Sequence, residues 1–358
     1  MKLMVLALIA FAGTTMLAAC GVSERTDAVA PAPQNPDAPV GGSLRVFTYE
    51  DTTAPDLMVP FEEQNPDLDV KTASFGSDEE AAAKLAAGFQ ADVVESCLDE
   101  MEPLTAEGLL RPLDPAGVPE WGNLSFTDAP GVTEAGKTWV VPLSAGPQGL
   151  IVNTEKAPDA PRSWKALFDP KYDGEASIEG DYELPAVAEA ALAMGIAEPM
   201  KMTRKQLGEV SAFLDSHVGQ FRSLWQSDSD LVNLFKSGEI VISDGGPGVA
   251  ARMAEAGIPV EWIAPEEGPL SWVCGLSITS NSQNVDAAYR LINWQASPKA
   301  QAIRAEDGYV LTNPTAIDLV PKKYRPTADP ATIEGAIAES RRPDEEEWVH
   351  VFQEFQAR

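Results

Sequence analysis

One stretch late in the chain, residues 265–295, constrains the fold more than any other. An apolar run at residues 270–278, with few helix-forming residues, predicts a buried strand, and a polar turn at residues 279–284 ends it. A helix is expected next, because Asn284 can cap it and apolar residues then recur at the spacing of one helical face: Ala287, Ala288, Leu291 and Ile292. A strand and a helix this late in a long chain indicate a return to a sheet that began much earlier.

The length of the chain favours two folded units. It has 358 residues, which suits two lobes of about 150 residues each. An apolar content of 44% is enough for a sizeable core, and after the N-terminus no apolar run is long enough to cross a bilayer. The expectation is therefore a globular protein with two lobes.

The N-terminus has the pattern of an export signal. Residues 1–19 carry Lys2, a short apolar run and then small residues, as in a secretory signal peptide. The sequence LAAC at residues 17–20 resembles the lipobox of bacterial lipoproteins, in which Cys20 would become the lipidated first residue; an ordinary signal peptide that happens to contain a cysteine is the alternative. Residues 20–42 contain four prolines among Ala, Asp and Asn, which predicts a flexible, lipid-anchored tether.

Charge and residue types exclude several functions. A net charge of −29 disfavours nucleic acid and anionic membrane surfaces and would attract a cationic ligand, although solubility or a salty habitat would explain it equally well. His217 and His350 have no zinc-motif partners, and we expect no metal and no cofactor. Cys97 and Cys274 each lie in an apolar run, which predicts two separate buried thiols, with a disulfide between them as the alternative.

The remaining pattern is that of alternating strands and helices. Strands are predicted at residues 43–47, 68–74, 91–94, 149–153 and 239–243, and helices at residues 55–65, 77–88, 185–195 and 249–256. Ser77 is a plausible N-cap, followed by three acidic residues that suit the positive end of a helix dipole. Ligands of open α/β sheets bind beyond the carboxyl ends of the strands, so the loop after residue 47 is a candidate wall of a binding site.

Several segments resemble a known family. Residues 260–264, the sequence PEEG at 265–268, Ser271-Trp272 and the chain from Ile278 onward are similar to the corresponding parts of the periplasmic spermidine/putrescine-binding proteins of ABC importers. The resemblance covers roughly residues 44–358. It implies an α/β fold of the type II periplasmic binding class, with two lobes and a hinge of two crossovers. The implied divisions are lobe 1 at residues 43–145 and 273–312, lobe 2 at residues 146–272, and C-terminal helices at residues 313–358 that pack across the lobes, with Gly146 as a hinge element.

The same resemblance implies a set of ligand-binding residues. Those matching the family's pocket positions or standing beside them are Tyr49, Thr52, Ser96, Asp181, Glu183, Asp244, Trp272, Tyr309 and Arg342. The rings suit an alkyl ammonium by cation–π contact, and the carboxylates by charge-assisted hydrogen bonds. Cys274 stands where the family has its most characteristic aspartate, and Thr52 where it has an aromatic residue.

These departures bear on the ligand. A long polyamine needs an anion at each end, so the loss at Cys274 favours a shorter diamine, or a zwitterion whose carboxylate Arg342 would bind bidentately. We therefore expect a monomeric periplasmic lipoprotein that delivers a polyamine, or a related cationic or zwitterionic amine, to an ABC permease in the inner membrane, without enzymatic activity. The alternatives are a hydrolase or lyase with a carboxylate-lined cleft, or a ligand-sensing partner protein.

Overall fold

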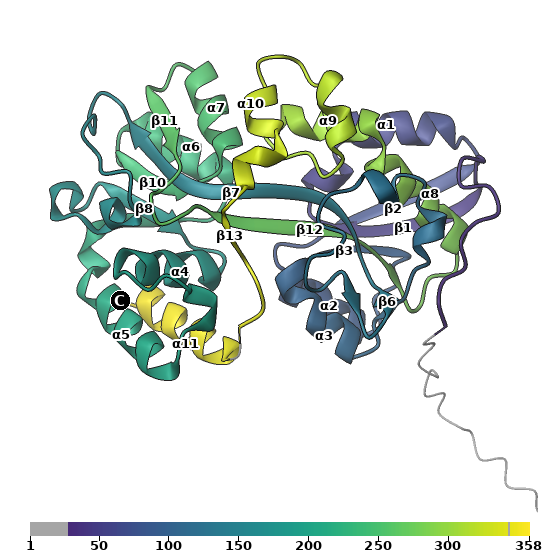
Figure 1. Cartoon of the computed structure of the whole chain (residues 1–358), viewed down its shortest axis with the longest axis horizontal. Coiled ribbons are helices and arrows are strands. Elements are labelled where there is room, and N and C mark those ends of the chain that lie inside the picture. The colour runs from purple at the N-terminus through teal and green to yellow at the C-terminus, as the bar shows by residue number, and fades with distance from the viewer. Residues whose placement is uncertain (1–27, 343) are drawn as a thin grey trace, which may run out of the picture.

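The computed structural model describes residues 28–342 and 344–358, which form two α/β lobes side by side (Figure 1). The predicted signal peptide, Cys20 and the start of the predicted tether lie outside the described residues. Two long neighbouring strands, β7 (Val141–Asn153) and β12 (Leu270–Thr279), run from one lobe toward the other. The expected α/β fold with two crossovers is therefore confirmed.

The sheet of lobe 1 begins at β2 (Leu68–Ser74) and continues through β1 (Gly42–Thr48) and β3 (Val93–Cys97) to β12. β1 is parallel to β2 and β3, whereas β12 is antiparallel to β3, as expected for a strand that returns from elsewhere. Helices α1 (Pro55–Gln64), α8 (Val285–Ala296) and α9 (Pro298–Glu306) lie on one side, and α2 (Asp78–Ala86) and α3 (Met101–Ala106) on the other (Figure 1). Leu44 and Val46 belong to the core on the first side and Phe47 to the core on the second, which is the alternation of a strand covered on both faces.

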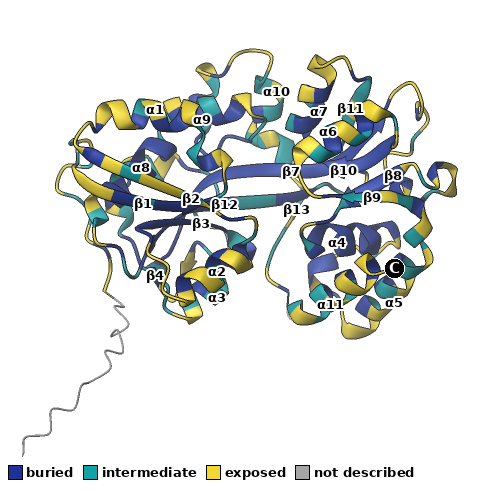
Figure 2. Cartoon of the chain, turned by 180° about the vertical axis from the view of Figure 1, so that it is seen from behind, coloured by how far each residue is buried: buried dark blue, intermediate teal, exposed yellow. Residues whose placement is uncertain are grey.

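The sheet continues through β7 into lobe 2, which has two cores. The other strands of lobe 2 are β8 (Ala176–Glu179), β9 (Phe221–Trp225), β10 (Ile242–Gly245) and β11 (Val260–Ile263). Helices α4 (Glu183–Ala193), α5 (Arg204–Ser216) and α11 (Glu345–Gln356) cover one face, and α6 (Asp228–Ser237) and α7 (Pro247–Glu255) the other. Every residue of α4 is buried (Figure 2), which explains why its sequence is rich in alanine rather than amphipathic.

Strand β7 is continuous through the junction between the lobes. Its residues 141–148 pair with β12, and residues 149–153 pair with β10 and β11. The sequence predicted a strand only at residues 149–153, whereas β7 begins at Val141 and runs through Gly146. Pairing with β12 ends at Gln148 and pairing with β10 begins at Gly149. The backbone of β7 therefore stays paired at both Gly146 and Gly149.

The C-terminal segment makes a third connection between the lobes. Helix α10 (Arg325–Ala328) packs beside α9 of lobe 1, and the short strand β13 (Ile337–Ala338) pairs with β12 at Leu270 and Ser271. The segment then ends in α11, which packs on α4 and α5 of lobe 2. Short strands β4 (Leu110–Arg111), β5 (Thr133–Glu134) and β6 (Lys137–Thr138) complete lobe 1.

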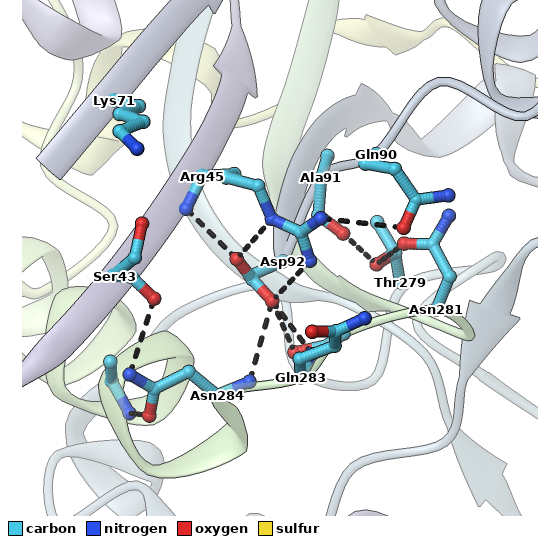
Figure 3. Close-up of polar contacts among 12 residues, drawn as sticks. Ser43, Arg45, Lys71, Gln90, Ala91, Asp92, Thr279, Asn281, Gln283 and Asn284 are labelled. Atoms are coloured by element: carbon cyan, nitrogen blue, oxygen red, sulfur yellow. Dashed lines mark hydrogen bonds and ion pairs between the residues drawn. The ribbon is translucent and has the colours of Figure 1, made fainter.

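A buried aspartate ties the start of lobe 1 to its returning part (Figure 3). Asp92 accepts hydrogen bonds from the backbone and guanidinium of Arg45 and from the backbone N–H of Gln283, and it also accepts from the Ser282 hydroxyl. Burial alone would raise the pKa of Asp92, but the hydrogen bonds from Arg45 and Gln283 lower it to about 2.

Cys97 and Cys274 form a disulfide, so the predicted pair of separate thiols was wrong. The two residues lie directly opposite each other on the antiparallel strands β3 and β12, with Cα atoms 3.8 Å apart. Sequence alone could not reveal this register, because it depends on where the returning strand pairs.

The lobes also meet between α7 and the turn after α9. A Cβ atom on Gly248 would lie 2.7 Å from the Cα atom of Gly308, so the two backbones are in direct contact. Nearby, Arg252 Nη1 donates to the Asp307 carbonyl at 2.9 Å, and Lys323 pairs with Glu255 at 3.0 Å. Within the described ranges, no helix combines the length and apolarity needed to span a membrane.

Candidate ligand site at the junction of the lobes

Two aromatic rings meet where β12 crosses the junction. The rings of Trp272 and Tyr309 are in edge-to-face contact, with centroids 5.6 Å apart, and both side chains are partly exposed. Trp272 lies opposite Gly146 on β7, and a Cβ atom on Gly146 would be 2.7 Å from Trp272 Cζ2. The Tyr309 hydroxyl donates to Asp51 Oδ2. The sequence-predicted pair therefore lies together at the hinge, with a carboxylate beside it.

The lobe 1 side of the junction carries buried acids. The Tyr49 hydroxyl donates to Asp78 Oδ2 at 2.8 Å, and the Tyr49 backbone N–H donates to Glu95 Oε2 at 3.3 Å. Burial raises the pKa of Glu95 to about 7, opposed by the charge of Arg304, and burial raises that of Asp78 to about 7. Both carboxyl groups are thus poised to change charge near neutral pH.

Thr52 is hydrogen-bonded inside the protein and is not exposed to a ligand. It is buried, and its Oγ1 accepts a hydrogen bond from Arg304 Nη2 at 2.9 Å. Arg304 also lies over the Tyr309 ring, 5.4 Å from its centroid. The threonine that replaces the family's aromatic residue thus accepts a hydrogen bond from a buried guanidinium, and this guanidinium also lies over the Tyr309 ring.

Lobe 2 presents three carboxyl groups around one amide, the Gln148 group. The Gln148 Nε2 atom lies 2.8 Å from Glu179, 3.0 Å from Asp244 and 3.4 Å from Glu189. Burial and the neighbouring carboxylates raise the pKa of Glu179 and of Glu189 far above the usual value, and burial raises that of Asp244 to about 6. Among the ion pairs of residues 28–342 and 344–358, none involves these three acids.

Asp244 and Glu179 differ in whether their oxygens can accept further hydrogen bonds. Asp244 is fully buried and also receives hydrogen bonds from Trp225 Nε1 at 2.7 Å and from the Glu179 backbone N–H at 3.0 Å, so its oxygens are already occupied by donors. Glu179 is partly exposed at the end of β8. Of the Gln148 group, Glu179 is therefore the carboxylate that can meet a ligand.

A second set of carboxylates surrounds Arg342, the Arg342 group. The Arg342 side chain is completely buried, and its Nη2 atom lies 2.7 Å from Glu183 Oε1 and 3.5 Å from Glu100 Oε1. Its Nη1 atom lies 3.5 Å from Asp99 Oδ2 and donates to the Tyr182 hydroxyl at 3.2 Å. Tyr182 in turn donates to Asp99 Oδ2 at 2.5 Å. Asp99 and Glu100 follow β3 of lobe 1, whereas Tyr182 is the N-cap of α4 in lobe 2 and Glu183 is its first residue, so this group joins the lobes.

Glu339 interacts electrostatically with both carboxylate groups. Its backbone N–H donates to the Ser271 carbonyl at 2.8 Å, beside Trp272. Burial and the charge of Asp99 raise the pKa of Glu339 to about 8, while Arg342 opposes this shift, and Glu339 in turn raises the pKa of Glu179. Glu339 therefore couples the Arg342 group electrostatically to the Gln148 group.

Two of the nine predicted residues, Ser96 and Asp181, lie beside acids of the groups described above. Ser96 is buried on β3, its hydroxyl donates to the Cys97 carbonyl at 3.2 Å, and a hydrogen bond from its side chain also opposes the raised pKa of Asp78. Asp181 is exposed on the loop after β8, where its side chain hydrogen-bonds with Glu179 and its charge helps to raise the pKa of Glu179. The other seven lie in the hinge pair, beside the lobe 1 acids and Arg304, and in the two carboxylate groups described above.

The chain matches a family model. Residues 56–332 match the model described as bacterial extracellular solute-binding protein. The chain belongs to this family. It is a family of binding proteins that work with ABC permeases rather than of enzymes, so the hydrolase or lyase alternative is not favoured, and the family expectation from the sequence is confirmed.

Individual relatives of this solute-binding protein are distant. Spermidine/putrescine-binding periplasmic protein 1 of Haemophilus influenzae is 24% identical, over 84% of this chain and 82% of its own. A putative spermidine/putrescine ABC transporter structure from Listeria monocytogenes superposes with a TM-score of 0.77 at 21% identity, covering 88% of this chain and 98% of its own. The structure of the Atu4243-GABA receptor superposes with a TM-score of 0.72 at 20% identity, covering 88% and 96%. These structures show that the fold is shared.

Several residues of the junction escaped the sequence analysis of this solute-binding protein. They are Glu95, Asp99, Glu100, Gln148, Glu179, Tyr182, Glu189, Arg304 and Glu339. Glu179 was detectable in principle, because it lies two residues before Asp181 in a segment that already supplied two candidates, Asp181 and Glu183. The other acids in this set gave no signal, since acidic residues are frequent throughout this chain and most of them are solvated.

Proposed function

We propose that this solute-binding protein captures a small cationic or zwitterionic amine, of the class that includes putrescine and spermidine, and presents it to an ABC permease. The observation that carries the proposal is Glu179, a partly exposed carboxylate without a basic partner among the described residues, on the same face of the junction as the hinge rings. Trp272 lies opposite Gly146, two residues from Gln148 on β7, and residues two apart on a strand share a face.

An ammonium ion fits this arrangement in two ways. Cation–π contact with Trp272 or Tyr309 would contribute about 0.5–2 kcal/mol, and a charge-assisted hydrogen bond to a carboxylate about 1.5–3 kcal/mol. A cation would also offset the mutual repulsion of the Gln148 group, whose three carboxyls cannot all ionise at low cost while buried. The spermidine/putrescine name of the Haemophilus relative and the GABA name of the structural neighbour agree with an amine ligand.

Isothermal titration tests the proposal directly. The purified chain is titrated with spermidine, putrescine, n-butylamine and 4-aminobutyrate, and with succinate as an amine-free control. At least one amine should bind, and Trp272→Ala should weaken that binding by about tenfold or more, which corresponds to a loss of about 1.4 kcal/mol. The same set of titrations without heat from any amine would refute an amine ligand.

We also propose that the chain acts as a monomer in the periplasm, anchored by a lipid on Cys20. The support is the LAAC sequence at residues 17–20 and the proline-rich stretch that follows it. Membrane fractionation of cells that express the full chain should find it with membranes, and Cys20→Ser should release it or leave it unprocessed. Wild-type protein found free of membranes would contradict the anchor.

A further inference from the structure

Protein groups surround Arg342 as a binding site would surround a cation, so its guanidinium is not free to contact a ligand. Its guanidinium is enclosed by carboxylates of both lobes, Asp99 and Glu100 from lobe 1 and Glu183 from lobe 2. It also lies over the ring of Tyr182, 5.7 Å from the centroid, and over the ring of Trp348, at 5.4 Å. Carboxylates and aromatic faces around a buried positive charge are the features with which a protein binds an organic cation.

Protein groups occupy the terminal nitrogens of Arg342, and its Nε atom is buried without a hydrogen-bond partner. Both terminal nitrogens are within 3.5 Å of protein carboxylates or the Tyr182 hydroxyl. An arginine stays charged at any physiological pH, so its charge offsets these acids permanently. The Gln148 group differs, because the amide at its centre carries no charge and no lysine or arginine of the described residues pairs with it.

We propose that Arg342 is a built-in cation that fills one of two acidic ends of the site and thereby restricts this protein to ligands with a single ammonium group. This inference rests on the proposed amine-binding function and narrows its ligand class. The ligand's ammonium would be received by Glu179 next to Trp272. A second ammonium, as in putrescine or spermidine, would approach acids whose charge the guanidinium of Arg342 already offsets.

The first experiment compares ligand preference in matched variants. Arg342→Gln removes the charge, Arg342→Lys keeps one, and Lys323→Gln removes an exposed charge from the other interlobe contact, the pair with Glu255. Calorimetry with n-butylamine, 4-aminobutyrate, putrescine and spermidine should show that the wild type prefers the ligands with one ammonium. In Arg342→Gln the affinity for putrescine and spermidine relative to n-butylamine should rise by about tenfold or more. Lys323→Gln should keep the wild-type order, and Arg342→Lys should stay closer to the wild type than Arg342→Gln.

Two results would overturn the inference: a wild type that binds spermidine more tightly than n-butylamine, or a folded Arg342→Gln variant with an unchanged order of ligands. Circular dichroism establishes that the variants are folded.

A second experiment needs no transported ligand. Ethylguanidinium mimics the end of the arginine side chain, so it should raise the melting temperature of Arg342→Ala in a concentration-dependent way and leave that of the wild type and of Lys323→Ala unchanged. No stabilisation of Arg342→Ala would overturn the inference. Stabilisation of this variant, together with a wild type that binds no amine, would retain the acidic cation site and refute the proposed function instead.

Discussion

The indole of Trp272 rests on the backbone of Gly146, the residue directly opposite it on the neighbouring strand. Since a Cβ atom at Gly146 would come within 2.7 Å of the ring, the orientation of Trp272 depends on the absence of a side chain there. The hinge glycine thus has a role in positioning the ring that is proposed to meet the ligand, in addition to any role in bending.

Gly146→Ala should therefore weaken amine binding by displacing Trp272. The expected loss is about tenfold, comparable with removal of a cation–π contact, and titration calorimetry measures it. Gly208→Ala is the matched control, because Gly208 is exposed on α5 and a Cβ atom added there would have no neighbouring atom within 4 Å. Equal affinities for both variants would show that the Trp272 orientation does not matter.

The disulfide should stabilise lobe 1 substantially. It links residues separated by 177 positions, and loss of a native disulfide typically costs about 2–5 kcal/mol. Cys97→Ser combined with Cys274→Ser should lower the free energy of unfolding by this amount in urea denaturation. In the wild type, alkylation under denaturing conditions should modify these two cysteines only after reduction; labelling without reductant would show that the thiols are free.

Stability should fall as the pH rises through neutrality. Burial raises the pKa of Glu100 to about 9, of Glu339 to about 8 and of Glu183 to about 7, each from an ordinary value of 4.5. The folded chain therefore binds these protons more tightly than the unfolded chain, and the free energy of unfolding decreases between about pH 5 and pH 9. Thermal melts should show a falling melting temperature, and Glu339→Gln should reduce its slope, whereas Glu209→Gln on the exposed face of α5 should not. A flat profile in the wild type would contradict these shifts.

The contribution of Asp92 to stability should be lost as the pH falls, which is the opposite pH dependence. Its pKa is lowered to about 2 from 3.8, so its contribution to stability is complete above about pH 4 and is lost as the pH falls through 2. Asp92→Ala should cost about 3 kcal/mol at neutral pH, because the partly buried Arg45 and the N–H of Gln283 lose their acceptor. Chemical denaturation measures this cost, and Asp69→Ala, which removes an exposed carboxylate on β2, should change stability by less than about 0.5 kcal/mol.

Most of the fold could be predicted from periodicity and caps. The strand at residues 68–74 matches β2 in both bounds, Ser77 and Asn284 cap their helices as expected, and the strand at residues 270–278 is β12 to within one residue. Strand β9 was missed, because Phe221–Trp225 is only partly buried and its alternation is interrupted. Local patterns therefore predicted where most elements lie, but they did not predict the length of β7.

The site was less predictable than the fold. Position-by-position resemblance brought Trp272, Tyr309 and Glu183 to the junction, yet it could not show that Glu183 would pair with Arg342. Pairing of this kind depends on where the C-terminal segment crosses the lobes, and such long-range placement leaves no periodic pattern in a sequence. The use of each predicted residue in ligand binding stays a prediction until the titrations are done.

The meeting of Gly248 with Gly308 has a consequence for how a permease could recognise this protein. Where main chain touches main chain, side-chain volume cannot adjust the spacing, so the contact defines a fixed stop for the approach of the two lobes. Ligands of different size would then leave the outer surface of the closed lobes the same. A permease could recognise the ligand-bound protein by that surface, whichever ligand is bound.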